Sequence, residues 1–211
     1  MNEEMTATAK DTYKAILDDF KSISTPIFTQ SSPKHGVKHF IVTSGPPVHA
    51  RARRLPPDKL AAAKARFAEM QEVGIIRRSN SPYSSPLHVV PKSDGGWRPC
   101  GDYRHLNEIT TPDRYPIPNL QDFTSGLAGK TVSSKFDLVC SYHQIPMKEE
   151  DIPQTSIITP FGLHEFLRML FGLKNAAQTF QRLMDTVCHN LDFVFVYLDD
   201  IMAASKDEAE H

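Results

Sequence analysis

Three cysteines, one tryptophan and no long apolar run characterise this sequence of 211 residues. Cys100, Cys140 and Cys188 are too widely spaced for a zinc site or a disulfide framework, which favours reduced thiols. No run of about 18 apolar residues is present, so neither a transmembrane helix nor a membrane partner is expected. The N-terminus lacks the basic and then apolar order of a signal peptide, and we therefore expect an intracellular protein.

The sequence also lacks a large excess of either charge, because its formal net charge is −1. The two signs are nevertheless unevenly placed. Residues 51–114 hold 12 Lys and Arg against 7 Asp and Glu, whereas residues 137–211 hold 5 against 12. This asymmetry suits a protein that binds a polyanion with one part and cations with the other. Two ordinary solvated faces explain it equally well.

The order of helical and strand patterns is mixed, which predicts an α+β fold and not a parallel βαβ series. Residues 1–57 predict an N-terminal helix over 1–24, then an extended connector with one short strand at 39–43. Asp58 and Asn175 are expected to cap the two strongest helices. The predicted helices are 58–73, a short one near 120–127 within otherwise irregular chain, and 175–189; the predicted strands are 75–78, 87–92, 97–103, 132–138, 155–159, 164–169, 194–198 and 201–204.

Two adjacent carboxylates, Asp199 and Asp200, lie between two apolar runs that predict the legs of a β-hairpin with both acids at its tip. Fixed like charges repel each other, so such a pair suits a site for hard cations such as Mg²⁺. A solvated Asp-Asp turn is the alternative. Asp137 ends a predicted strand that can pair with 194–198 and bring a third carboxylate to the same place. Three carboxylates can hold two Mg²⁺ about 3.5–4 Å apart.

A second hairpin is predicted by the turn Ser93-Asp94-Gly95-Gly96, which separates two apolar strands. Lys92 and Arg98 flank this turn. A Gly-rich loop between two cations can fold over phosphate groups. A surface hairpin with solubilising charges is the alternative.

Several motifs, in one order, resemble the reverse transcriptase of gypsy-type LTR retrotransposons, which are relatives of retroviral polymerases. The resemblance covers about residues 35–211 and implies a right-hand polymerase, with fingers from the region 75–135 and a palm that holds the aspartates. It implies one domain over 58–211 that comprises fingers and a partial palm of antiparallel strands and packed helices, truncated after the Asp-Asp hairpin and without a thumb. The motifs are 74–77, 81–86, 96–107, 134–138, 142–146, 171–176 and 197–200.

The resemblance implies an RNA-directed DNA polymerase, a nucleotidyltransferase that adds dNTPs to a primer on an RNA or DNA template. It makes Asp137, Asp199 and Asp200 the catalytic residues. These aspartates and the backbone carbonyl of Leu138 would bind two Mg²⁺ ions, for which Mn²⁺ can substitute. One metal would lower the pKa of the attacking hydroxyl, and the other would stabilise the departing pyrophosphate.

The resemblance also implies a dNTP-binding site formed by Lys92, Arg98, Leu138, Tyr142 and Phe171. The Tyr142 ring would act as a steric gate, because it would occupy the space that a ribose 2′-hydroxyl needs. An ordinary half-buried aromatic residue is the alternative for Tyr142. Tyr197 would lie near the primer end.

Two departures from the family pattern bear on the function. Cys140-Ser141 replaces a pair that commonly ends in Gly, so Ser would fit badly if a positive φ is needed at 141. The family's thumb, RNase H and integrase parts are expected partners that are absent from this chain. The alternative function is therefore a truncated, inactive retroelement remnant with at most weak nucleic-acid binding. A two-metal nuclease is a third reading. An active element would work in cytoplasmic particles.

Overall fold

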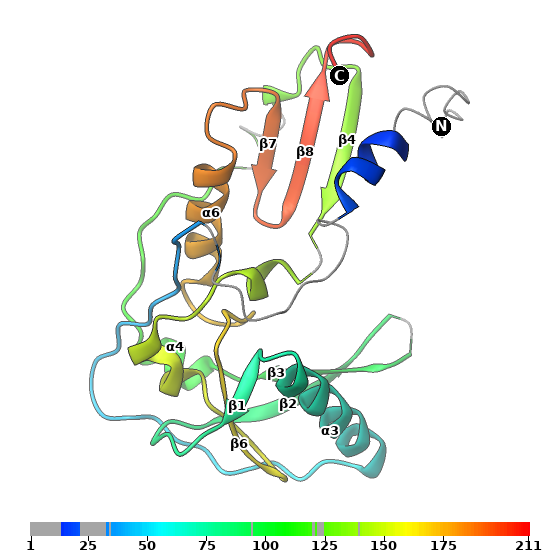
Figure 1. Ribbon diagram of the computed structural model, residues 1–211. Helices are drawn as coiled ribbons and strands as arrows, with labels where there is room; N and C mark the ends of the chain where they lie inside the picture. The colour runs from blue at the N-terminus through cyan, green and yellow to red at the C-terminus, as the bar shows by residue number, and fades with distance from the viewer. Residues whose placement is uncertain are drawn as a thin grey trace.

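Two β-sheets, in two lobes, form the framework of the chain in the computed structural model (Figure 1). The structure describes residues 14–21, 33, 35–93, 95–119, 121, 125–138 and 140–211. One sheet has the strand order β1-β6-β5-β2-β3, and the other has the order β4-β8-β7. The predicted α+β class is confirmed. Within the described ranges, no helix is long and apolar enough to cross a membrane.

The five-stranded sheet is built from hairpins that the turn residues predict. β2 and β3 form the hairpin around residues 93–96, and β5 and β6 form another, whereas β2 and β5 run parallel. Helix α3 packs beside this sheet and buries Ala63, Phe67 and Met70, which recur at helical spacing. The elements are β1 Ile76–Arg78, β2 Ser85–Pro91, β3 Trp97–Gly101, β5 Ile157–Thr159, β6 Gly162–Phe166 and α3 Pro57–Glu72.

The three-stranded sheet consists of β4 (Val132–Asp137), β7 (Val194–Tyr197) and β8 (Asp200–Ser205). β4 pairs with β8 and not with β7, so the predicted pairing of the strands 132–138 and 194–198 is wrong. The returning leg of the hairpin takes the central place, between the other two strands. Helix α6 (Ala176–Val187) lies beside this sheet (Figure 1). It buries Phe180, Leu183 and Met184, as its apolar spacing predicts.

Short helical turns occur in addition to the helices that the sequence predicts. Helix α4 (Arg104–Ile109) is only six residues long, and it is held by the complete burial of Leu106. Two 3₁₀ helices follow, η1 (Ser141–Gln144) and η2 (Glu149–Thr155). Such short elements depend on tertiary packing, because an isolated turn is unstable and too short to show a period. The predicted helix near 120–127 falls mostly outside the described residues.

The predicted caps are wrong for both strong helices. Pro56 occupies the N-cap position of α3, and no side chain caps that helix. Asn175 does stand at the N-cap of α6 but makes no capping bond. Its side chain instead donates to the Thr111 carbonyl at 2.8 Å and accepts from the Asp113 amide at 3.0 Å. Tertiary contacts thus occupy the Asn175 amide that the local sequence assigned to the helix end.

The connector is tied to the rest of the molecule without forming the predicted strand at 39–43, where only isolated bridges occur. The His39 amide donates to the Pro146 carbonyl at 2.9 Å, and the Lys148 amide donates back to the His39 carbonyl at 2.7 Å. Residues 14–21 are largely helical and exposed, and the remainder of the predicted helix 1–24 lies outside the described residues.

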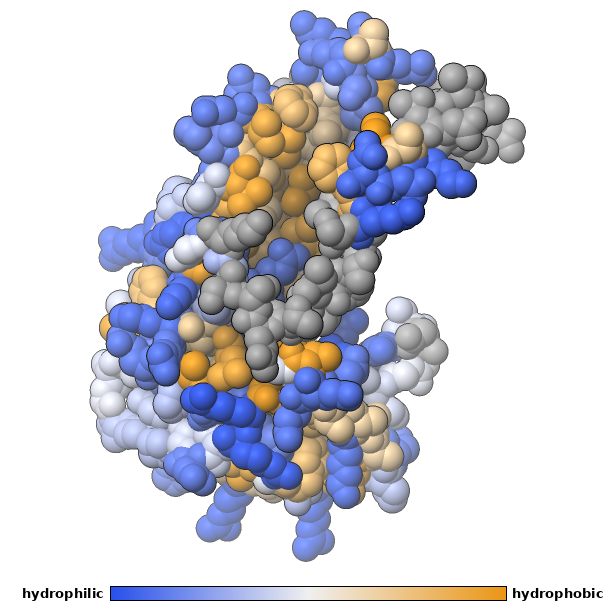
Figure 2. Space-filling model, viewed as in Figure 1, coloured by the Kyte–Doolittle hydropathy of each residue, from blue (hydrophilic) through white to orange (hydrophobic). Residues whose placement is uncertain are grey.

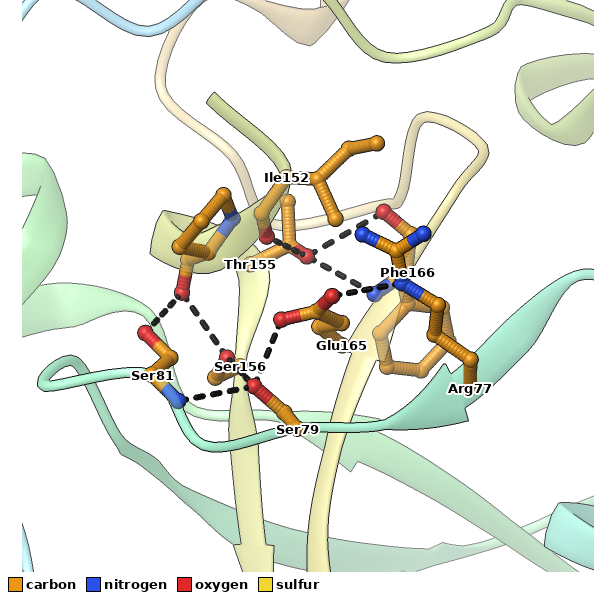
Figure 3. Close-up of polar contacts among 9 residues, drawn as sticks. Arg77, Ser79, Ser81, Ile152, Thr155, Ser156, Glu165 and Phe166 are labelled. Atoms are coloured by element: carbon orange, nitrogen blue, oxygen red, sulfur yellow. Dashed lines mark hydrogen bonds and ion pairs between the residues drawn. The ribbon is translucent and has the colours of Figure 1, made fainter. Parts of the chain in front are cut away.

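A partly buried polar cluster joins β1, β6 and η2 in the lower lobe (Figure 3). The Glu165 carboxylate accepts hydrogen bonds from Ser79 Oγ at 2.5 Å and from Arg77 Nε at 2.7 Å. Thr155 Oγ1 accepts from the Phe166 amide at 2.8 Å and donates to the Ile152 carbonyl at 2.6 Å. These bonds satisfy polar groups inside the lobe, which would otherwise be costly to bury.

Hydrophobic residues gather over the three-stranded sheet in the face shown by Figure 2. Phe136 in β4 and Phe193 beside β7 are 46% and 49% exposed. The sheet therefore leaves large apolar side chains uncovered, whereas the core residues of the other sheet are buried.

Candidate active site

Strand register brings the predicted carboxylates to one end of the three-stranded sheet. Asp137 is the last residue of β4 and pairs directly with Asp200, the first residue of β8. Leu198 and Asp199 form the two-residue turn between Tyr197 and Asp200, which are paired. The turn tip thus carries only Asp199, whereas Asp200 already belongs to the strand. The predicted hairpin forms, but its turn begins one residue earlier than predicted: Leu198 and Asp199 form the turn, instead of Asp199 and Asp200.

The turn depends on an unusual backbone conformation at Leu198. Its φ of 54° lies in the left-handed region, which two-residue hairpin turns require but a leucine rarely adopts. A non-glycine residue in this region costs about 1–2 kcal/mol. The paired strands on both sides hold the conformation, which fixes the direction of the Asp199 backbone.

Lys135 lies beside the carboxylates, and the sequence interpretation did not include it. Its Nζ is 2.7 Å from Asp200 Oδ1. The hydrogen bond and charge of Asp200 raise the pKa of Lys135, with smaller contributions from the charges of Asp137 and Asp199. The sequence could have indicated Lys135, because this residue lies two positions before Asp137 in a predicted strand, and residues two apart on a strand share a face.

Tyr142 forms the centre of an aromatic stack next to these acids. It is 6% exposed, and its ring centroid lies 4.1 Å from that of Phe171 and 5.3 Å from that of Phe180. Burial raises the pKa of the Tyr142 phenol, and the charge of Asp199 adds to this shift. The structure therefore brings the predicted gate residue and Phe171 together. Phe180, on α6, was not predicted to support them.

Polar side chains fix the loop that carries Phe171. Asn107 Nδ2 donates to the Gly172 carbonyl at 2.7 Å, and Asn107 Oδ1 accepts from the Lys174 amide at 2.9 Å. Lys174 Nζ in turn donates to the Thr110 carbonyl at 2.8 Å. Gly172 has a φ of 90°, which a residue with a side chain would adopt only with strain. This loop is thereby clamped to the end of α4.

The donor chemistry of the acid cluster fits a hard divalent cation, since carboxylate oxygens are the ligands that Mg²⁺ prefers. Within the described part of the chain, however, no three His, Cys, Asp or Glu side chains stand close enough together to hold a metal ion. Asp200 is bound to Lys135 instead. A metal at this site would require Asp200 to leave Lys135. Leu138, whose carbonyl was predicted as a further ligand, follows Asp137 directly and is partly buried.

The predicted triphosphate contacts lie apart from the acids. Lys92 and Arg98 are exposed on the β2–β3 hairpin, which projects from the lower lobe (Figure 1). Among the described residues, no hydrogen bond or ion pair joins either cation to the three aspartates. The turn itself includes Asp94, which lies outside those residues.

A positive φ occurs at Cys140 (52°) and not at Ser141, so the serine at 141 causes no backbone strain.

Comparison with solved structures defines the class of fold. The foamy viral protease-reverse transcriptase in complex with an RNA/DNA hybrid matches with a TM-score of 0.84 and 19% identity, covering 99% of this chain and 28% of that one. A second foamy viral protease-reverse transcriptase, in complex with double-stranded DNA, gives a TM-score of 0.78 at 20% identity, covering 99% of this chain and 37% of that one. At this identity the likeness shows the fold alone, which is that of reverse transcriptase fingers and palm.

Sequence comparison then gives the family. The family described as "Reverse transcriptase (RNA-dependent DNA polymerase)" matches residues 90–211. The Pol polyprotein from transposon opus of Drosophila melanogaster is 37% identical over 205 residues, covering 93% of this chain and 20% of its own length. The Pol polyprotein from transposon gypsy of the same species is 40% identical over 146 residues, covering 65% and 14%. The chain belongs to the reverse transcriptase family, as predicted, and spans about a fifth of these relatives or less.

Proposed function

We propose that this chain is the fingers and palm portion of an RNA-directed DNA polymerase that extends a primer with dNTPs. The observation that carries the proposal is the direct pairing of Asp137 with Asp200, with Asp199 in the adjoining turn. Strand pairing fixes the relative positions of Asp137 and Asp200 more firmly than a loop would. Family membership supports the same chemistry, because reverse transcriptases use divalent metal ions.

In this proposal, Asp137, Asp199, Asp200 and the Leu138 carbonyl hold two Mg²⁺ ions, for which Mn²⁺ can substitute. The bound metal would neutralise developing charge on the phosphates and lower the pKa of the primer hydroxyl. The protein contributes position, because β4 and β8 hold two of the acids in register. Asp200 exchanges its contact with Lys135 for a metal contact.

The nucleotide side of the proposed site is divided between the two lobes. Arg98 and Lys92, which are exposed on the β2–β3 hairpin, would bind the triphosphate of the incoming dNTP. Tyr142 would exclude a ribose 2′-hydroxyl, because its ring is stacked on that of Phe180 and cannot move aside in that direction. Phe171, which is 60% exposed, would form the open wall of the same pocket.

The partners follow from the same proposal. A template-primer of RNA or DNA would lie across the acidic hairpin, as foamy viral relatives of this fold were solved with an RNA/DNA hybrid and with double-stranded DNA. Since the curated relatives are about five times longer, we also propose that thumb, RNase H and integrase regions of a Pol polyprotein act with this chain, in cytoplasmic particles of the element.

Primer extension on poly(rA)·oligo(dT) with Mg²⁺ and dTTP tests the proposed activity. The chain should extend the primer, and Asp199→Asn should reduce the rate at least about 100-fold if this acid holds a metal in the transition state. Equal extension by both proteins would overturn the polymerase proposal for this chain, and no extension by either would favour the inactive remnant.

In the same assay, Tyr142→Ala should allow the primer to be extended with rUTP. Unchanged discrimination between dTTP and rUTP would show that Tyr142 is not the steric gate.

A further inference from the structure

Lys135 is placed on the acidic face of the sheet by strand geometry. Side chains alternate along a strand, so Lys135 and Asp137 point to the same face of β4. In the antiparallel register, Asp200 lies opposite Asp137, and Met202 lies opposite Lys135. Lys135 and Asp200 are therefore diagonal neighbours on one face, within reach of a long side chain. The observed Nζ–Oδ1 distance of 2.7 Å realises this contact.

The contact places one cation against the same carboxylate that the proposed metal site uses. This ion pair joins Lys135 directly to one of the three predicted metal ligands. Its side chain is 61% exposed, and that of Asp200 is 56% exposed. An exposed ion pair contributes little net stability and can open at low cost. The ammonium group can thus leave Asp200 without disturbing the strand that carries it.

We propose that Lys135 and a divalent cation compete for the Asp200 carboxylate, so that Lys135 sets the affinity of the site for metal. This inference rests on the proposed metal site. The lysine neutralises part of the repulsion among three neighbouring carboxylates, which stabilises the paired strand ends. A divalent cation supplies more positive charge at the same place, and the lysine then turns towards solvent. The role of Lys135 is to position Asp200 and limit metal binding.

Binding of Mn²⁺ to the purified chain, followed by the electron paramagnetic resonance signal of the unbound ion, tests this competition. Lys135→Met removes the competing charge and should tighten Mn²⁺ binding about fivefold at low ionic strength, which is the factor expected for one nearby charge in a high dielectric. The gain should shrink in high salt, because exposed charges are screened. Lys135→Arg keeps a competitor, and its affinity should stay within about twofold of the unaltered chain.

Two controls separate this effect from a general change of charge. Lys130→Met removes one charge two residues before β4, at the end of this strand away from Asp137, and it should change Mn²⁺ affinity by less than about twofold because Coulomb energy falls with distance. In an Asp200→Asn background, the shared carboxylate is gone, so Lys135→Met should give no gain. Thermal unfolding of each variant establishes that it is folded, and Lys135→Gln replaces Lys135→Met if the latter does not fold.

The outcomes distinguish the inference from the function on which it rests. Equal or weaker Mn²⁺ binding by the folded Lys135→Met protein, with measurable binding by the unaltered chain, would overturn the competition but keep the metal site. Equal tightening by Lys130→Met would also overturn it. Absence of Mn²⁺ binding by both the unaltered chain and Lys135→Met would overturn the proposed metal site and the competition together.

Discussion

The two sheets differ in how firmly their surroundings hold them. In the five-stranded sheet, Ile76, Leu87, Ile157 and Phe166 are all at most 3% exposed. In the three-stranded sheet, no residue of β4 or β7 is buried, and only Ala204 and Ser205 are buried in β8. Regions with few buried apolar contacts open at a lower free energy than the rest of a protein. The proposed catalytic acids therefore lie on the less stable sheet.

The polar contacts differ in the same direction. The Glu165 carboxylate in the five-stranded sheet is buried and has two partners, Arg77 and Ser79, in and just after β1. The Asp200 carboxylate in the three-stranded sheet is exposed and forms an ion pair with Lys135. A buried carboxylate must keep its partners, whereas an exposed one can exchange them. The five-stranded sheet is therefore suited to act as a rigid scaffold, whereas Asp200 in the three-stranded sheet is suited to exchange Lys135 for another cation.

The largest expected contrast is between apolar truncations in the two sheets. Leu87→Ala should lower the free energy of unfolding by about 2–5 kcal/mol, because it leaves a cavity in a closed core. Phe136→Ala should lower it by less than about 1 kcal/mol, because this ring is already 46% exposed. Urea denaturation of both variants measures the two values. Equal losses would show that the three-stranded sheet is packed as firmly as the other.

A second contrast compares the two carboxylates. Glu165→Ala should cost about 1–3 kcal/mol, since it removes the buried acceptor of Arg77 and of Ser79, although Ser79 then keeps its contact with Ser156. Asp200→Ala should change stability by no more than about 0.5 kcal/mol, because its ion pair is exposed. Denaturation by urea at neutral pH checks both values. A larger loss for Asp200→Ala than for Glu165→Ala would reverse the assignment of rigid and exchangeable groups.

A third prediction concerns the junction between the connector and α6, where His39 Nδ1 lies 2.8 Å from Thr179 Oγ1. Burial lowers the pKa of His39 from 6.5 to about 4, against the opposing charge of Asp113. As the pH falls, His39 therefore becomes protonated at a higher pH in the unfolded chain than in the folded chain. The stability contributed by neutral His39 is complete above pH 6.5 and is lost progressively towards pH 4, by about 2 kcal/mol at pH 5.

Urea denaturation between pH 7.5 and about pH 4.5 measures this loss, and His39→Gln is the control that removes the titrating group. His143, whose pKa burial also lowers to about 4, contributes the same slope in both proteins. The difference between the two pH profiles therefore isolates His39. Identical profiles would contradict the assignment of a buried, neutral His39 at this junction.

Much of this molecule was determined by local sequence patterns. Periodic apolar residues specified α3 and α6, and the Gly-rich turn specified the β2–β3 hairpin. The motif 197–200 specified the acidic hairpin, because two apolar legs and two turn residues suffice for it. The ordered motifs also indicated the family, which the comparisons confirm.

Tertiary structure alone decided how these pieces meet. Whether β4 paired with β7 or with β8 depended on competition for sheet edges, which no local pattern records. Helix α4 exists because Leu106 is enclosed by distant residues, and Asn175 bonds the 111–113 segment instead of its own helix. The contact of Lys135 with Asp200 likewise required the strand register, because it joins residues that are far apart in sequence. Periodicity indicates the secondary structure that one segment favours by itself. Strand pairing and burial depend on which strand edges and apolar surfaces the other segments leave unoccupied.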